Sequence, residues 1–110
     1  MSIELTSVTN DMYQVSQRID KASKEIFKLA KNKAEFERVY REALAKEIMQ
    51  LRADGVQATL IPDLARGKVA YLKFERDLAK DTYKAGISAL EAVKTQASVL
   101  QTICKYQEVL

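Results

Sequence analysis

The chain has 110 residues, of which 30% are charged and 47% hydrophobic, and its formal net charge is +3. This size fits one domain, and this composition is typical neither of a disordered tail nor of a membrane protein. With 3 glycines, 1 proline, 1 cysteine and no histidine, the sequence argues against β-rich folds and excludes Ser-His-Asp and Cys-His catalysis, the usual zinc ligand sets and an intramolecular disulfide.

The first long helical pattern covers about residues 8–54, which is roughly 70 Å of helix. Its apolar residues recur in steps of three and four, as in a coiled coil. This first seam consists of Val8, Met12, Val15, Ile19, Ala22, Ile26, Leu29, Phe36, Tyr40, Leu44, Ile48 and Leu51. Lys33 interrupts the seam, where its stem can be buried while its ammonium group reaches water. At the end of the pattern, Gly55 is expected in the left-handed conformation, with Val56 touching Leu51.

A connector of about residues 55–67 follows. Thr59 is a candidate N-cap, and Pro62 with Asp63 suits the first turn of a short helix over residues 61–66. Gly67 either kinks or ends that helix. The connector is too apolar for a plain surface loop, so its apolar residues either cap the core of a hairpin or bind a partner. We assign Leu64 to the cap and name as candidate partner-binding residues Leu60, Ile61 and Arg66.

The second long pattern covers about residues 68–108. Its seam consists of Val69, Leu72, Ala79, Tyr83, Gly86, Leu90, Val93, Ala97, Leu100 and Cys104, with Arg76 as the one charged seam residue. Two long helices with one connection predict an all-α, antiparallel, coiled-coil-like hairpin. Folding the chain about residues 60 to 61 places Glu47 opposite Lys73 or Phe74, and Glu37 opposite Lys84.

The far end of the hairpin is apolar on two sides. A further row on the second helix lies more than about 100° from the seam and consists of Val99, Ile103, Tyr106 and Leu110. The first helix begins with Ile3, Leu5 and Val8 at the same end. Because two helices alone cannot bury such an end, we expect a homodimer that forms a four-helix bundle, with this row at its interface.

A basic row lies on the first helix, within about an 80° arc. Its members are Lys21, Lys24, Lys28 and Lys31. Such a row can follow a phosphate backbone or meet an acidic protein, or it is simply a solvated face. Only Phe27 interleaves it, so stacking on single-stranded nucleic acid is poorly supported.

No motif for catalysis or phosphate binding occurs, and nearly all carboxylates lie off the seams. We therefore predict no catalytic residue, no metal site and no cofactor, and interpret Cys104 as a small buried hydrophobe. No apolar run approaches the ~18–20 residues of a membrane span, and the first five residues lack the features of a signal peptide. The expectation is a cytoplasmic protein.

The run Leu51-Arg52-Ala53-Asp54-Gly55, followed by residues 58–67 (ATLIPDLARG), resembles small uncharacterised helical proteins of phages and prophages of Gram-positive bacteria. The resemblance implies expression in the host cytoplasm and carries no known active residue. We expect a non-catalytic accessory protein that binds a host or phage protein, as a modulator or inhibitor of an enzyme. The alternatives are a nucleic-acid-binding protein that uses the lysine row, and a structural or assembly helper of the virion.

Overall fold

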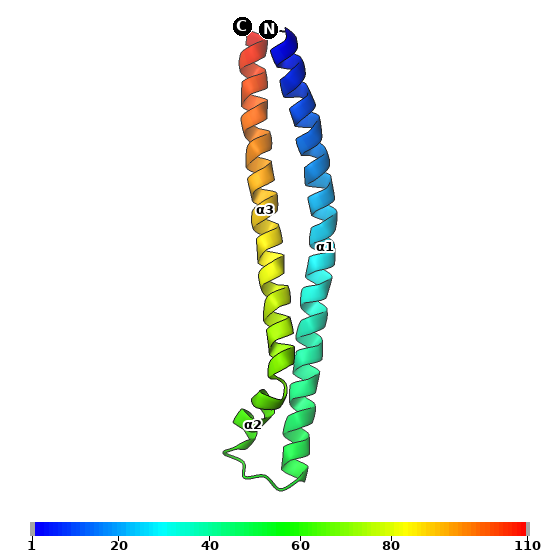
Figure 1. The fold of residues 1–110 in the computed structure, drawn as a ribbon, viewed down its shortest axis with the longest axis vertical. Helices are drawn as coiled ribbons and strands as arrows, with labels where there is room; N and C mark the ends of the chain where they lie inside the picture. Colours follow the sequence, from blue (N-terminus) through cyan, green and yellow to red (C-terminus); the bar gives the residue numbers. More distant parts are fainter. Residues whose placement is uncertain (1, 110) are drawn as a thin grey trace. The chain divides into compact units, whose positions relative to one another are not determined.

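The computed structural model describes the backbone of residues 2–109 and the side chains of residues 6–106. In this part the chain forms three helices and no strand: α1 (Ser2–Ala53), α2 (Ile61–Lys68) and α3 (Ala70–Val109) (Figure 1). The prediction of an all-α fold is confirmed. α1 begins at Ser2 and not near residue 8, because residues 2–7 contain neither glycine nor proline to stop it. Leu110, predicted at the dimer interface, lies outside the described residues.

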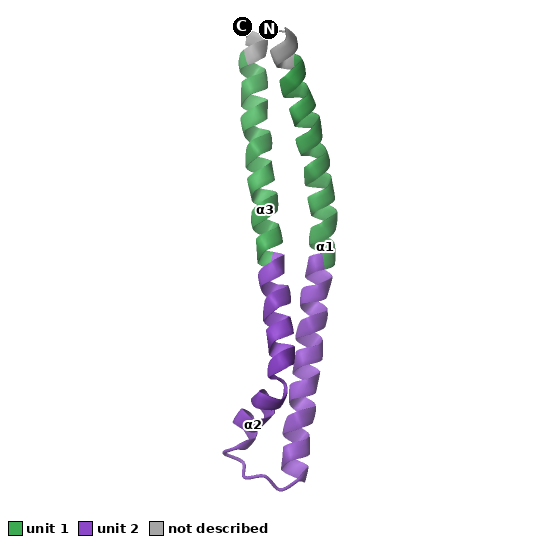
Figure 2. Ribbon diagram, viewed as in Figure 1, with its two compact units in different colours: residues 1–28, 84–110 green, residues 29–83 purple. Residues whose placement is uncertain are grey.

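The helices are divided between two compact units (Figure 2). Unit 1 comprises residues 1–28 and 84–110, and unit 2 comprises residues 29–83. In each unit a segment of α1 runs antiparallel to a segment of α3, as predicted for a helical hairpin. Unit 2 also contains the connector and α2.

α1 ends in unit 2 with the predicted glycine stop. Gly55 has a φ of 77°, in the left-handed region. The backbone N–H of Val56 donates to the carbonyl of Leu51 over 3.1 Å, and that of Gly55 donates to the carbonyl of Arg52, also over 3.1 Å. These two bonds define the Schellman motif, which satisfies carbonyls that the helix leaves free at its C-terminus.

α2 folds back onto the end of α1 and closes the core of unit 2. Ile61 and Ala65 are buried together with Leu51. Around this cluster pack further apolar side chains that are half-buried: Leu44, Ile48 and Val56. Ala65 is fully buried, so its small side chain allows α2 to approach α1 closely.

Two details of α2 differ from the sequence prediction. Its N-cap is Leu60, without a side-chain hydrogen bond, and not Thr59. Leu64, assigned to the core cap, is 46% exposed. The reason is helical spacing: Ile61 and Ala65 are four residues apart and share the inward face, which leaves Leu64 beside it. Pro62 and Asp63 lie in the first turn, as predicted.

The break between α2 and α3 falls at Val69, so Gly67 lies inside α2 and does not end it. Val69 is 3% exposed and has φ −107° and ψ 15°. Its N–H donates to the carbonyl of Ala65 over 3.2 Å, and its own carbonyl accepts from the N–H groups of Leu72 and Lys73 over 3.0 and 3.1 Å. Burial of this β-branched side chain therefore accompanies the change of direction, while the backbone stays hydrogen-bonded on both sides.

The register of unit 2 is shifted from the prediction. Glu47 pairs with Lys68 over 3.7 Å and not with Lys73. Glu37 pairs with Arg76 over 3.5 Å and not with Lys84. The predicted fold-back point ignored α2, whose packing against α1 brings an earlier part of the second pattern opposite each glutamate.

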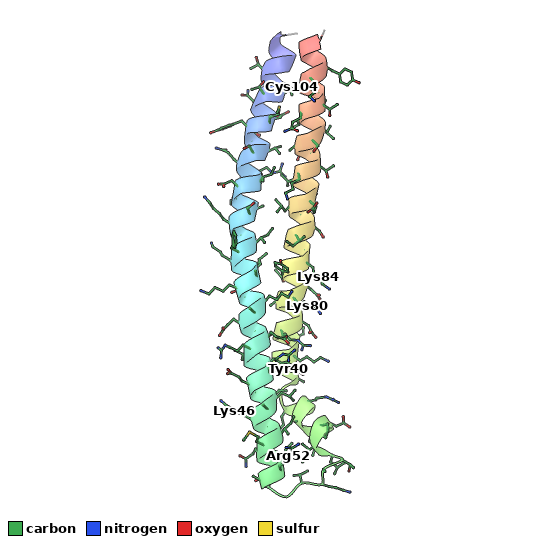
Figure 3. All side chains as sticks on the ribbon, turned by 180° about the vertical axis from the view of Figure 1, so that it is seen from behind. Tyr40, Lys46, Arg52, Lys80, Lys84 and Cys104 are labelled. Carbon is green, nitrogen blue, oxygen red and sulfur yellow. The ribbon has the colours of Figure 1, made fainter. Side chains whose placement is uncertain are left out.

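Two cations cover aromatic rings between the helices of unit 2. The guanidinium of Arg76 lies 4.5 Å from the ring centroid of Tyr40, and the ammonium group of Lys33 lies 4.8 Å from that of Tyr83. Tyr40 lies between α1 and α3 (Figure 3). The charged residues that interrupt the two seams are thus accommodated by cation–π contacts.

Unit 1 is more loosely packed than unit 2. Among its described side chains only Val15 is buried, at 2% exposure. Arg18 on α1 connects to α3 through a hydrogen bond: its Nη1 donates to Oε1 of Gln96 over 3.3 Å. The remaining seam residues of unit 1, Cys104 included, are half-buried. One pair of helices therefore buries few side chains completely here.

Candidate protein-binding surface

An apolar stripe on the outer side of α3 is the main unpartnered feature of unit 2. Tyr71, Phe74 and Leu78 are 68%, 65% and 53% exposed. Their spacing places them within about a 60° arc of the helix. We call these three residues the unit 2 stripe. Exposed apolar residues scattered singly are normal on protein surfaces, but three large ones on two turns of one face form a patch.

A groove between α1 and α3 adjoins the unit 2 stripe. It has a volume of about 230 Å³ and is lined by Leu29, Asn32, Phe36, Glu75, Leu78, Ala79 and Thr82. Leu78 belongs to both the stripe and the groove, so the two features are continuous. The groove is large enough for one or two apolar side chains of a partner, beside a stripe on which the rest of a helix face could lie.

The charges closest to the stripe along α3 are carboxylates. Glu75 lines the groove, and Asp81 lies one turn beyond Leu78. Both are exposed, and within the described part of the chain neither has an ion-pair partner within 4 Å. By their spacing along the helix, Lys73 and Lys80 lie on the side of α3 opposite the stripe. On its α3 side the patch is therefore apolar and bordered by carboxylates, on a chain of net charge +3.

The predicted partner-binding residues of the connector do not form one surface. Leu60 is 52% exposed, which leaves its side chain free for a contact. Ile61 is 6% exposed and belongs to the core cluster, so its side chain does not face outward for docking as expected from the sequence. Arg66 is exposed and pairs with Asp63 over 3.6 Å, a contact of the weak surface type.

The lysine row is exposed but partly paired with acidic neighbours. Lys24 lies 3.2 Å from Asp20, and Lys28 lies 3.9 Å from Glu25. The division between the units separates Lys21, Lys24 and Lys28 from Lys31. Carboxylates interleaved with the row reduce its positive potential, so the structure does not strengthen the case for phosphate binding.

The predicted dimer residues on α3 also remain uncovered in the single chain. Val99, Ile103 and Tyr106 are 54%, 39% and 69% exposed. We call these three the unit 1 stripe. Next to α3 in the same unit lies a cavity of about 470 Å³, lined by Met12, Ser98, Gln101, Thr102, Cys104 and Lys105. The exposure of the unit 1 stripe agrees with a position at an interface and does not by itself show a dimer.

The carboxylates with perturbed acidity belong to exposed ion pairs. The pKa of Glu37 is lowered by a 2.6 Å hydrogen bond from Nε of Arg41. The pKa of Glu35 is lowered by a hydrogen bond that Arg38 donates to it, and Arg38 also donates to Glu42. In this arrangement the carboxylates are held charged by arginines on the same helix, as in structural ion-pair networks.

Within the described residues no three side chains of metal-binding type come together. Over the same part of the chain, no helix combines the length and the apolar character needed to cross a bilayer. Comparison with protein-family models, with curated proteins and with solved structures gives no match.

Sequence reasoning missed the unit 2 stripe, although its signal was present. Tyr71, Phe74 and Leu78 are spaced three and four residues apart and lie off the second seam. The same type of signal led to the prediction of the unit 1 stripe. Charged residues between the three side chains concealed the pattern, because they gave this part of α3 the appearance of a solvated face.

Proposed function

We propose that this protein is a non-catalytic binding protein that recognises another protein by helix packing. The observation that carries this proposal is the unit 2 stripe, with the groove that continues it. Exposed aromatic and leucine side chains next to a groove are typical of protein interfaces, whose energetic centres are rich in aromatic residues.

Self-association is the second part of the proposal. The unit 1 stripe would pack against a second copy and bury side chains that a single hairpin leaves exposed. Support comes from the exposure of Val99, Ile103 and Tyr106 and from the scarcity of fully buried side chains in the described part of unit 1. Two-fold pairing of antiparallel hairpins gives a four-helix bundle.

The role that we propose is an accessory one in the cytoplasm, in which the protein modulates a host or phage enzyme. The support for a phage or prophage origin is the resemblance of the connector and the end of α1 to small phage proteins. The alternative, nucleic-acid binding through the lysine row, has the exposure of Lys21, Lys24, Lys28 and Lys31 in its favour.

Affinity capture from lysate of the producing cell, with and without nuclease, distinguishes these functions. Three forms are compared: the natural chain, Phe74→Ser with Leu78→Ser, and a variant with all four lysines of the row changed to Gln. The proposal predicts a protein that survives nuclease, is lost with the serine variant and is kept with the Gln variant. Capture that depends on nucleic acid and on the lysines would contradict it.

A further inference from the structure

The unit 2 stripe has a charge pattern that restricts the kind of partner it can accept. Glu75 and Asp81 lie on the two sides of the line that joins Tyr71, Phe74 and Leu78, by their angular positions on α3. An apolar residue of a partner that packs on the stripe would bring its flanking residues next to these carboxylates. A positive charge there would gain an ion pair at a partly desolvated rim, and a negative charge would be repelled.

A second copy of the same surface is a poor occupant. An isologous contact would place stripe on stripe and bring Glu75 and Asp81 of one chain near the same carboxylates of the other. Like charges held across an interface disfavour that pairing. The unit 2 stripe thus differs from the unit 1 stripe, for which we propose a second copy.

The shape of the surface favours a helix as the occupant. The stripe runs along two turns of α3, and the groove between α1 and α3 lies parallel to it, as the lining by Leu29, Phe36, Leu78 and Thr82 shows. An amphipathic helix supplies apolar side chains at the same three- and four-residue spacing, so one could enter the groove while others lie on Phe74 and Tyr71.

We infer that the unit 2 stripe and its groove bind an amphipathic helix of another protein, whose apolar face is flanked by lysine or arginine. This inference rests on the proposed function and adds the chemical class of the partner. The net charge of +3 disfavours basic ligands in general, so a preference for them must come from the local carboxylates.

Selection from a displayed library of helical peptides tests the inference. In each peptide, Leu, Ile or Phe occupies positions i, i+3 and i+7, and the flanking positions vary among Lys, Gln and Glu. Selection on the full-length natural chain is expected to enrich lysine at the flanks. Selection on a chain with Glu75→Lys and Asp81→Lys is expected to enrich glutamate instead.

Affinity measurements with the best enriched peptide complete the test. Phe74→Ser should weaken its binding at least tenfold, whereas Phe27→Ser should leave it unchanged. Phe27 is a matched control because it is 78% exposed on α1 and belongs neither to the stripe nor to the residues that line the groove. Both variants remove an exposed side chain, and equal thermal midpoints would show that each variant folds.

Three results would overturn the inference. The first is that no peptide is enriched, and the second is that the charge of the enriched flanking residues is the same for the natural chain and for the chain with Glu75→Lys and Asp81→Lys. The third is a stripe variant that sediments as a smaller assembly than the natural chain. The last would mean that a second copy occupies the stripe. If capture from lysate depends on Phe74 and the library shows no preference for lysine, the proposed function stands and the partner class is wrong. If that capture is independent of Phe74, the proposed function fails first.

Discussion

Ile61 and Leu64 show how strongly the fate of an apolar residue depends on its place in the helical turn. Both lie in the same short helix, yet Ile61 is 6% exposed and Leu64 is 46% exposed. The sequence revealed that α2 was too apolar for a plain loop, but not which residues would face α1. That choice depends on the packing angle of α2, which Ala65 and Leu51 set through their burial in one cluster.

Truncation of these two residues should therefore have unequal effects. Ile61→Ala is expected to lower the free energy of unfolding by about 2–4 kcal/mol, because it leaves a cavity in the core of unit 2. Leu64→Ala should cost less than about 1 kcal/mol, because much of the side chain already meets water. Chemical denaturation of both variants measures the difference. Equal losses would show that Leu64 contributes to the core as much as Ile61 does.

Glu37 provides a test at acidic pH. Its pKa is lowered, chiefly by the hydrogen bond from Arg41, with Arg76 as a further positive neighbour. Because the pKa is lower in the folded state, its ion pairs contribute to stability at pH values above its ordinary value of 4.5 and lose that contribution as the pH falls through the folded-state pKa.

The comparison is between the natural chain and Glu37→Gln. Their thermal midpoints should differ at pH 7 in favour of the natural chain and converge as the pH falls through the lowered folded-state pKa, where Glu37 becomes protonated. The effect should be small, because the pair is exposed. A difference that persists unchanged at pH 3 would mean that the carboxylate charge is not its source.

The ends of the helices were predicted well where local chemistry sets them. Gly55 and the Val56–Leu51 hydrogen bond follow from neighbouring residues alone, and the structure has both. The junction at Val69 was not predicted, because burial against the rest of unit 2 fixes it and no glycine or proline marks it. The register failed for the same reason: the pairing of Glu37 with Arg76 depends on how α2 packs.

The two glycines of the connector region should respond in opposite ways to alanine. Gly55→Ala is expected to cost about 1–2 kcal/mol, because a Cβ atom is disfavoured at a φ of 77°. Gly67→Ala should stabilise the fold by about 0.5–1 kcal/mol, because Gly67 lies inside α2 and an added Cβ would have no atom within 4 Å. Thermal unfolding of both variants measures this. Stabilisation by Gly55→Ala would contradict the role of the left-handed turn.

For the molecule as a whole, the sequence predicted the helical class and the antiparallel pairing within each unit. Those properties depend on the long seams, whose described residues are buried or half-buried in the structure. The candidate binding site was predicted less well. The connector residue Ile61 became core, and the unit 2 stripe was overlooked, because exposure beside a groove is a property of the packed helices and not of spacing alone.

Self-association through the unit 1 stripe gives a prediction at this scale. Sedimentation equilibrium at micromolar concentration should give close to twice the chain mass of 12.4 kDa. Ile103→Asp should shift the assembly toward monomer, because a carboxylate would be buried without a partner. The charge is tolerated in the single chain, where Ile103 is 39% exposed. A natural chain that sediments as a monomer, or an Ile103→Asp variant that remains dimeric, would rule out this interface.

The most direct measurement of protein binding by the unit 2 stripe is site-specific photo-crosslinking. A benzophenone amino acid replaces Phe74 in one variant and Lys80, on the opposite side of α3, in a control. Both positions are exposed, so both variants should fold. In lysate of the producing cell, our account predicts a discrete protein adduct from position 74 that is absent from position 80 and resists nuclease. No adduct at position 74, or the same adducts from both positions, would contradict it.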